Sequence, residues 1–379
     1  MKIIVDENIP LGKEAFENIG EVELHGGRTI NNSVVKDADA LVVRSITKVN
    51  KELLQNSSIK FVGTATIGTD HIDEEYLAES GVAFSSAAGC NSYSVTEYIF
   101  SAITYFAEKY NFDISKKSIG VIGYGNIGTK IIKVANALGM TSVINDPPLE
   151  RDSDSNIFSS LDEALKCDIV TFHVPLNKDG VDKTVHLLND ENINLIKDDA
   201  IVINASRGPV ISNEALKKRL QKKNNLHAVI DVWETEPNFD SELLQLVEIG
   251  TPHIAGYSFE GKVNGTTMIY EALSDFLKTP KTWKPILDKV SNNEITIEKE
   301  DDTLAIFKKL FDKSYNVIDD DAMLRESVNF TDEKKSEHFD LLRKKYRRRR
   351  ELNNFKVIMN FENDKLENLL NVLRVKKSV

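Results

Sequence analysis

Three charged side chains in three short motifs are of the types that oxidation of a 2-hydroxy acid requires. They are Arg207 in NASRGPV, Glu236 in DVWETEP and His253 in TPHIAGY, and each motif follows an apolar run expected to be a strand. A guanidinium can hold a carboxylate by two parallel hydrogen bonds. An imidazole can take the hydroxyl proton, and an adjacent carboxylate stabilises the protonated ring and fixes its tautomer. Because open α/β sheets bind ligands at their strand ends, these motifs are the candidate site.

The stretch from Ser118 to Asp146 predicts a nucleotide site. Gly123, Gly125 and Gly128 form G-x-G-x-x-G between an apolar run and a helical pattern. In such a βαβ unit the first glycine permits a tight turn, the second lets backbone approach a pyrophosphate, and the third lets helix and strand pack closely. Asp146 would accept hydrogen bonds from the adenosine ribose and disfavour a 2′-phosphate. We therefore expect NAD rather than NADP; the alternative is a purely structural glycine turn.

Composition limits the other possibilities. The chain has 379 residues, enough for two or three domains, with 41% hydrophobic content and a net charge of −11. This charge argues against nucleic acid as a main partner. No apolar stretch approaches the roughly 20 residues that span a bilayer, and no signal-peptide pattern opens the chain. Cys90 and Cys167 lack metal-ligand spacing, so we expect reduced thiols, no metal, no membrane partner and a cytoplasmic location.

The pattern of strands and helices predicts an α/β protein with two doubly wound parallel-sheet domains. One is a flavodoxin-like substrate domain, residues 1–92 and 257–280, and the other is a Rossmann-type NAD domain, residues 93–256. The first alternates five strands, Lys2–Asp6, Glu21–Leu24, Ala40–Arg44, Lys60–Thr64 and Val82–Ser85, with helices at Leu11–Ile19, Lys51–Gln55 and Ile72–Ser80.

A long helix, Asn91–Tyr110, should lead into the second domain and act as a hinge, and Phe259–Phe276 should return to the first. Beyond the glycine unit, the expected strands are Asp168–Val174, Ala200–Asn204 and His227–Val232, with helices at Ser160–Lys166, Asp190–Ile196 and Asn213–Lys222, and Glu248–Gly250 precedes the motif with His253. After a linker at Thr279–Trp283, residues 281–379 read as a small α+β domain whose expected role is association. Its strands are Ile295–Glu298 and Lys356–Phe361, and its helices Leu304–Phe311, His338–Arg347 and Lys365–Leu373.

Two strand ends in the first domain carry polar groups. Arg44 and Lys48 flank Ser45 and could hold an anion, while Thr66 with Gly68 offers a hydroxyl and backbone amides. A solvated loop that only closes a βα turn explains both segments equally well.

The motif set GYGNIG, NASRG, DVWETEP and TPHIAGY resembles the D-isomer-specific 2-hydroxyacid dehydrogenases. Further motifs, among them MKIIVDENIP, FVGTATIGTDHID and HIAGYSFEGKVNGTT, narrow the match to a member with a phosphorylated substrate and a C-terminal dimerisation domain. The resemblance implies Arg207 and Glu236 as catalytic residues, His253 as proton donor and acceptor, and a homodimer.

The same resemblance implies ligand contacts. Substrate contacts would be Ser45, Thr66 and Tyr257, and residue type adds Arg44. Cofactor contacts would be Gly123, Gly125, Asn126, Ile127, Gly128, Asp146, Thr171, Ser206, Arg207, Gly208, Asp231 and Gly256. The rival functions are a related enzyme, such as a 3-phosphoglycerate dehydrogenase, and an NAD-sensing binding protein without turnover.

Other residues favour structural interpretations. His173 lacks an acidic neighbour in sequence and is interpreted as structural, and His71 as part of a helix start. Asp231 could cap a loop instead of contacting NAD. The run KKYRRRR, residues 344–350, is interpreted as a solvated helix face; contact with an acidic subunit surface or with a substrate phosphate across a dimer is the alternative.

Overall fold

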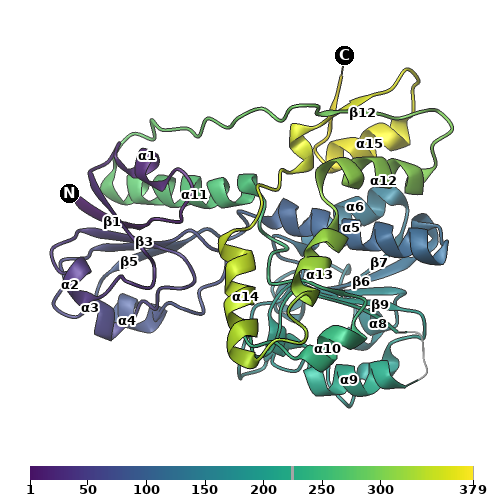
Figure 1. The fold of residues 1–379 in the computed structure, drawn as a ribbon, viewed down its shortest axis with the longest axis horizontal. Helices are drawn as coiled ribbons and strands as arrows, with labels where there is room; N and C mark the ends of the chain where they lie inside the picture. The colour runs from purple at the N-terminus through teal and green to yellow at the C-terminus, as the bar shows by residue number, and fades with distance from the viewer. Residues whose placement is uncertain (223–225, 379) are drawn as a thin grey trace. The chain divides into compact units, whose positions relative to one another are not determined.

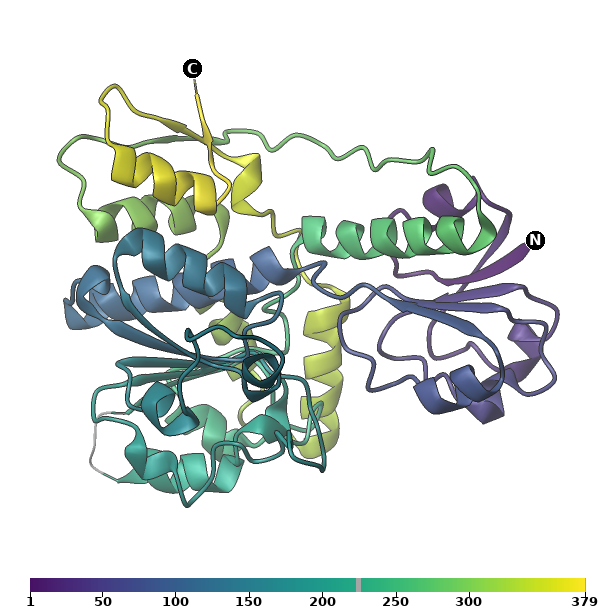
Figure 2. The ribbon, with the colours of Figure 1, turned by 180° about the vertical axis from the view of Figure 1, so that it is seen from behind.

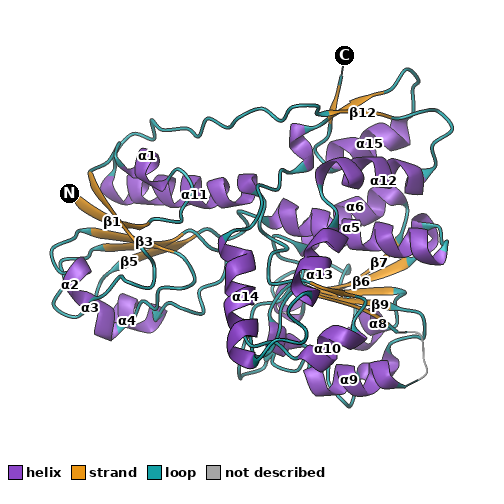
Figure 3. Cartoon of the chain, viewed as in Figure 1, coloured by secondary structure: helices purple, strands orange, loops and turns teal. Residues whose placement is uncertain are grey.

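A computed structural model describes residues 1–222 and 226–378. These residues form two compact units (Figure 3). The first unit comprises Met1–Asn91 and Ser258–Lys289, and the second comprises Ser92–Tyr257 together with the residues from Val290 onward. The predicted domains 93–256 and 281–379 include residues 223–225 and 379, which lie outside the described residues. The predicted three-domain division stays a prediction.

The first unit is built on a five-stranded parallel sheet in the order β2-β1-β3-β4-β5, which is the flavodoxin-like order. Its strands are β1 (Lys2–Asp6), β2 (Glu21–His25), β3 (Ala40–Val43), β4 (Phe61–Thr64) and β5 (Ala83–Ser86). Its helices are α1 (Gly12–Phe16), α2 (Asn32–Val35), α3 (Lys51–Leu54), α4 (Glu74–Glu79) and α11 (Phe259–Leu277), which lies along the sheet in Figure 1.

Burial on both faces explains the apolar strands of this sheet. Every residue of β3 and β4 is buried, with one cluster of core residues on each face. A Cβ at Gly63 would lie 2.3 Å from Cγ2 of Ile269, so this glycine lets α11 pack closely on β4. Val43 pairs with Thr64, and therefore the residues that follow β3 and β4 leave the same edge of the sheet.

The second unit contains a six-stranded parallel sheet in the order β11-β10-β9-β8-β6-β7. The strands are β6 (Ser118–Ile122), β7 (Thr141–Asn145), β8 (Ile169–Phe172), β9 (Ile201–Asn204), β10 (His227–Ile230) and β11 (Ile249–Gly250). The helices are α5 (Ser92–Tyr110), α6 (Gly128–Leu138), α7 (Pro147–Arg151), α8 (Leu161–Leu165), α9 (Asn213–Gln221) and α10 (Ser241–Leu246), with short 3-10 turns at Ile114–Lys116, Ile193–Leu195 and Gly208–Val210. The chain reverses its direction of winding between β6 and β8, which is where such sheets bind nucleotides.

The C-terminal segment packs on helices α5 and α6 and on the edge strand β11 of this second unit. It contains β12 (Glu294–Thr296), β13 (Lys356–Ile358) and β14 (Lys376–Lys377), with α12 (Thr303–Ser314), α13 (Val317–Arg325), α14 (Asp332–Lys344), a 3-10 turn (Leu352–Asn354) and α15 (Asp364–Val372). Phe307 of α12 lies against Phe100 of α5, with ring centroids 6.0 Å apart. In Figure 2, α15 (yellow) and α6 (blue) lie side by side, and residues of both belong to one core cluster.

Two predicted helices differ from the structure. Only Ile193–Leu195 of the predicted helix Asp190–Ile196 is helical, and it forms a 3-10 turn. The side chain of Asn192 accepts from the backbone N–H of Asn189, and such side-chain bonds compete with helix formation. The predicted helix His338–Arg347 instead runs from Asp332 to Lys344. Within the described ranges, no helix is long and apolar enough to cross a membrane.

Candidate active site

The His253 imidazole and the Glu236 carboxylate form a hydrogen-bonded pair. Nδ1 of His253 lies 2.6 Å from Oε1 of Glu236, and the side chains are 31% and 26% exposed, respectively. Because Nδ1 is engaged by the carboxylate, Nε2 is the ring nitrogen that can exchange a proton with a substrate. The geometry therefore supplies an oriented base at the C-terminal edge of the second sheet.

Burial and charge act in opposite directions on Glu236. Removal from water opposes ionisation of this carboxyl group, but the nearby His253 and, after it, Arg343 outweigh that effect, so the pKa of Glu236 lies below its ordinary value. The carboxylate is thus ionised and can stabilise an imidazolium.

The loop that carries His253 is held by Asp231 at the end of β10. The Asp231 carboxylate accepts hydrogen bonds from the Thr251 hydroxyl (2.6 Å) and from the backbone N–H groups of Ile254 (2.8 Å) and Ala255 (3.0 Å). Asp231 is 1% exposed, and its carbonyl oxygen accepts from the backbone N–H of His253 (2.7 Å). His253 adopts φ +56°, a left-handed conformation uncommon outside glycine and found at functional sites. Asp231 thus orders the loop; its predicted contact with NAD stays a prediction.

The NASRG turn packs against the loop that leads to Glu236. Ser206 donates its hydroxyl to Asn204 Oδ1 (2.9 Å), and the Arg207 guanidinium donates to the Ser206 carbonyl (2.8 Å). A Cβ at Gly208 would lie 2.1 Å from the Trp233 backbone. Glycine is therefore required for these two strand-end loops to meet.

The glycine loop has the geometry that its spacing predicts. Gly123 has φ +95°, and a Cβ there would lie 2.5 Å from the His173 carbonyl oxygen. A Cβ at Gly128 would lie 2.0 Å from the Gly123 oxygen, whereas a Cβ at Gly125 would meet no atom within 4 Å. The first and third glycines thus permit the turn and the close packing, and open space remains beside the second. Asn126 is exposed, and Ile127 precedes α6.

Asp146 lies beside this loop. Its carboxylate accepts from the backbone N–H of Tyr124 (2.7 Å) and from that of Leu149 (3.1 Å), which caps α7. The side chain is half-buried at the end of β7. It is therefore fixed next to the glycine turn, where the ribose of a dinucleotide is bound in βαβ units.

Thr171 and His173 lie at the end of β8. The Thr171 hydroxyl is fully buried and lies 2.7 Å from Nε2 of His173. Burial lowers the pKa of His173 to about 3, so its ring is neutral. Among the described residues, Nδ1 of His173 has no hydrogen-bond partner. Gly256 lies in the turn before Tyr257.

The predicted substrate residues of the first unit gather at one sheet edge. Arg44 follows β3, donates to the Asn8 carbonyl at 3.4 Å and is half-buried, and Ser45 is exposed. Thr66 follows β4 and lies 2.7 Å from the Thr64 hydroxyl, which also contacts Nε2 of His71 at 3.0 Å. The helix after His71 begins only at Glu74, capped by Asp73, so the interpretation of His71 as a helix start is wrong.

The interpretation of the basic run as a solvated helix face is wrong for Arg349, which is buried. Arg349 is 3% exposed and donates to the carbonyl oxygens of Ala255 (3.1 Å) and Ser94 (2.7 Å). Arg347 pairs with the buried Asp320 at 2.6 Å. Only Lys344 of the run is helical, while Lys344, Lys345, Arg347 and Arg348 are exposed. Sequence reasoning also missed Arg343, although Phe339 and Leu342 place it beside the apolar face of α14.

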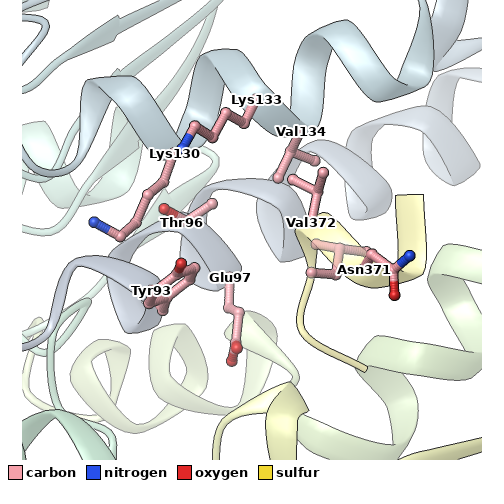
Figure 4. Close-up of a pocket in the computed structure, with 9 residues that line it drawn as sticks. Tyr93, Thr96, Glu97, Lys130, Lys133, Val134, Asn371 and Val372 are labelled. Carbon is pink, nitrogen blue, oxygen red and sulfur yellow. The ribbon is translucent and has the colours of Figure 1, made fainter. Parts of the chain in front are cut away.

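A cavity of about 290 Å³ lies between α5, α6 and α15 (Figure 4). It is lined by Tyr93, Thr96, Glu97, Lys130, Lys133, Val134, Asn371, Val372 and Leu373, none of which is a predicted site residue. Burial, with Glu351 nearby, raises the pKa of Glu97 to about 8. Lys130 Nζ donates to the Asn126 carbonyl at 2.8 Å, so the wall of this cavity adjoins the glycine loop.

Comparisons with known proteins agree with this geometry. Residues 102–255 match the NAD-binding domain of the D-isomer-specific 2-hydroxyacid dehydrogenases. Residues 286–373 match a domain of unknown function, DUF3410.

Two relatives match along nearly the whole chain. The erythronate-4-phosphate dehydrogenase of Cronobacter sakazakii is 46% identical over 354 residues, which cover 93% of this chain and 92% of that protein. The erythronate-4-phosphate dehydrogenase of Tolumonas auensis is 46% identical over 372 residues, covering 97% and 98%.

Solved structures share the fold. A D-lactate dehydrogenase from Aquifex aeolicus, complexed with NAD and lactic acid, is 25% identical with a TM-score of 0.58 and covers 73% of this chain and 96% of that one. An NAD-bound 3-phosphoglycerate dehydrogenase from Entamoeba histolytica is 24% identical with a TM-score of 0.63, covering 73% and 95%. The predicted fold class is confirmed. This chain belongs to the erythronate-4-phosphate dehydrogenases, within the D-isomer-specific 2-hydroxyacid dehydrogenase family.

Proposed function

We propose that this protein catalyses the NAD-dependent oxidation of 4-phospho-D-erythronate to 2-oxo-3-hydroxy-4-phosphobutanoate. The observation that carries the proposal is the 2.6 Å bond between His253 Nδ1 and Glu236 Oε1, on loops at the carboxyl edge of a dinucleotide-type sheet. The substrate follows from relatives named for it that are 46% identical over nearly the whole chain.

The residues divide the reaction among them. Arg207 holds the substrate carboxylate, and Nε2 of His253 takes the proton of the 2-hydroxyl group. Glu236 holds the ring through Nδ1 and stabilises the imidazolium that results. NAD, when bound, supplies the acceptor for the hydride from the same carbon. A general base contributes roughly 10²–10⁴ in rate, and positioning supplies much of the remainder.

The residues around the glycine loop fit NAD. Gly125 leaves open space where a pyrophosphate would meet backbone, and the N-terminus of α6 follows at Gly128. The Asp146 carboxylate is fixed beside the same loop. The remaining proposed contacts are Thr171, Ser206–Gly208, Asp231 and Gly256.

The choice of cofactor should depend on Asp146. We expect Asp146→Ala to raise the Michaelis constant for NAD by about 10- to 100-fold, because charge-assisted hydrogen bonds contribute about 1.5–3 kcal/mol. Oxidation with NADP should become measurable, since the carboxylate no longer repels a 2′-phosphate. Asp73→Ala is a matched control, because Asp73 caps α4 in the first unit. An unchanged preference for NAD in Asp146→Ala would contradict the assignment.

The distal phosphate of the substrate is proposed to meet Arg44 and Ser45. We expect Arg44→Ala and Ser45→Ala each to raise the Michaelis constant for 4-phospho-D-erythronate roughly 10-fold, as loss of a hydrogen bond to a charged group predicts. D-erythronate, which lacks the phosphate, is the control substrate, and its weaker turnover should be insensitive to both substitutions. Equal effects on both substrates would remove these residues from the phosphate site.

The direct test is to incubate the purified protein with 4-phospho-D-erythronate and NAD and to follow NADH absorbance, with and without an added 2-oxo acid. Steady NADH production supports the proposal. A stoichiometric burst that becomes sustained only with the oxo acid supports it too, and means that the cofactor is recycled while bound. Turnover with 3-phosphoglycerate alone would retain the chemistry and reject the substrate. Absence of NADH formation with either substrate would favour an NAD-sensing protein.

We also propose that the product serves pyridoxal 5′-phosphate (vitamin B6) biosynthesis, that the protein acts in the cytoplasm, and that it forms a homodimer through its C-terminal segment. The motif resemblance supports all three. Light scattering of the purified protein measures its mass in solution, and a monomer would reject the dimer.

A further inference from the structure

One arginine of the C-terminal segment reaches the catalytic loops. The guanidinium carbon of Arg343, near the end of α14, lies 5.7 Å from the centre of the Tyr257 ring and 5.9 Å from that of Phe339. Arg343 also hydrogen-bonds to the Tyr257 side chain and interacts electrostatically with Glu236. Within the described ranges, its buried Nε has no hydrogen-bond partner. Arg343 thus lies close both to the Glu236 carboxylate, which is bonded to His253, and to Tyr257, a proposed substrate residue.

Packing fixes α14 on the loop that carries Glu236. Phe339, fully buried one turn before Arg343, lies 6.0 Å from Phe239, which in turn lies 5.4 Å from Trp233. Nζ of Lys335 donates to the Ser241 hydroxyl at 3.0 Å. These contacts leave little freedom for α14 to move relative to residues 233–239.

The residues after α14 support the loop that carries His253. Tyr346 meets Tyr257 edge to face, with ring centroids 5.7 Å apart. The Arg349 guanidinium lies 3.5 Å from the centre of the Tyr315 ring and donates to the Ala255 carbonyl. The segment around Arg343 therefore contacts both catalytic loops, although its sequence family has no known function.

We propose that Arg343 is a positioning residue for the proposed reaction: its guanidinium holds Tyr257 and, through Glu236, limits how strongly His253 retains a proton. The inference rests on the proposed function for its kinetic consequence. Its structural basis is independent of the substrate, because the Glu236–His253 bond and the Arg343 contacts are internal to the second unit.

The direction of the effect follows from the charges around His253. The titratable and charged groups that face the pair or hold its loop are Glu236, Asp231, Tyr257, Arg343 and Arg349. The Glu236 carboxylate, bonded to Nδ1, favours the protonated ring, and the cation of Arg343 near that carboxylate opposes it. Removal of that cation leaves the Glu236 carboxylate less compensated, so the ring should hold its proton to higher pH.

A titration without substrate tests this directly. In protein with labelled histidines, the His253 resonance is identified by its absence in His253→Ala. In Arg343→Met, its titration midpoint should move upward by roughly half to one pH unit. Lys344→Met is the matched control, since it removes the same charge from the exposed neighbouring residue. Arg343→Lys should restore the midpoint because it keeps the charge.

Steady-state kinetics provide the second readout. The pH midpoint of the acid limb of kcat/KM for oxidation should rise in Arg343→Met by the same amount as the His253 titration midpoint, because the base must be deprotonated to act. The Michaelis constant for 4-phospho-D-erythronate should rise about 3- to 10-fold through the loss of Tyr257 positioning. In Arg343→Lys the acid limb should return to its wild-type pH, because the charge is kept. The Michaelis constant should return only part of the way to the wild-type value, since an ammonium lacks the planar fork of guanidinium.

The two readouts separate the two proposals. A moved midpoint without turnover of 4-phospho-D-erythronate by the wild-type protein would reject the substrate and retain Arg343 as a positioning residue. Normal wild-type turnover with an unmoved midpoint and an unchanged Michaelis constant in a folded Arg343→Met would reject the inference. An equal shift of the His253 titration midpoint in Lys344→Met would reject the inference too, because loss of any nearby positive charge would then have the same effect.

Discussion

Alanine at position 253 should lower kcat for oxidation of 4-phospho-D-erythronate by about 10²–10⁴, the usual contribution of a general base. His253 is the ring that Glu236 orients through a 2.6 Å bond, and its backbone is held by the Asp231 carbonyl. Without the imidazole, only water can take the hydroxyl proton. Affinity for NAD, measured by fluorescence titration, should stay unchanged, since the proposed NAD site is centred on the glycine loop. Unchanged kcat would leave His253 without a catalytic role.

A second histidine provides a matched control. Nδ1 of His227 lies 2.6 Å from Oε2 of Glu248, the same distance as between His253 Nδ1 and Glu236 Oε1. His227 begins β10, however, at the opposite edge of the sheet from the loops that carry Glu236 and His253, and its ring lies 4.4 Å from that of Tyr110. His227→Ala should therefore reduce stability without lowering kcat. The contrast would show that position at the sheet edge, and not the bond alone, makes the pair catalytic.

Glu236→Gln should lower kcat by a similar factor, because an amide that donates to Nδ1 would leave the proton on Nε2. The double variant should lose little beyond His253→Ala, as residues that act as one unit are not additive. Additive losses would instead mean that Glu236 acts on the substrate independently of His253.

The sheets and the nucleotide loop could be predicted because their signals are local. Buried parallel strands require continuous apolar runs, and the predicted strand Lys2–Asp6 coincides with β1. The glycine spacing reflects sterics within one βαβ unit, so Gly123 and Gly128 have the predicted geometry. The partnership of Glu236 with His253 was predictable from chemistry, since each follows a strand of one sheet.

The role of the C-terminal segment was not predictable, because its signals are not local. Arg349 is buried by carbonyl groups of Ala255 and Ser94, which are 94 and 255 residues away in sequence. A run of basic residues looks the same whether it is solvated or satisfied by distant backbone. The role of Asp231 was not predictable for the same reason. Its hydrogen-bond partners lie 20 or more residues later in the sequence, in the loop after β11.

Asp231→Asn should destabilise the protein by roughly 2–4 kcal/mol and lower kcat by about 10- to 1000-fold. Three donors converge on the buried Asp231 carboxylate: the Thr251 hydroxyl and the N–H groups of Ile254 and Ala255. An amide accepts through one oxygen only, so its NH₂ would face an N–H donor, and an unsatisfied buried group costs about 1–3 kcal/mol. The uncommon φ of His253 also depends on this anchoring. Urea unfolding and steady-state kinetics measure the two effects.

Asp321→Asn separates loss of stability from loss of loop geometry. The Asp321 carboxylate accepts from the backbone N–H of Gly250 at 2.7 Å and from Nε of Arg325, and it is 8% exposed, but it holds β11 and not the loop with His253. Asp321→Asn should therefore lower the free energy of unfolding while kcat stays unchanged. A fall in kcat confined to Asp231→Asn, at constant Michaelis constant for NAD, would identify the carboxylate as the support of the catalytic loop. A raised Michaelis constant for NAD with normal kcat would instead identify Asp231 as a cofactor contact, and the bonds to residues 251–255 would then be of structural importance alone.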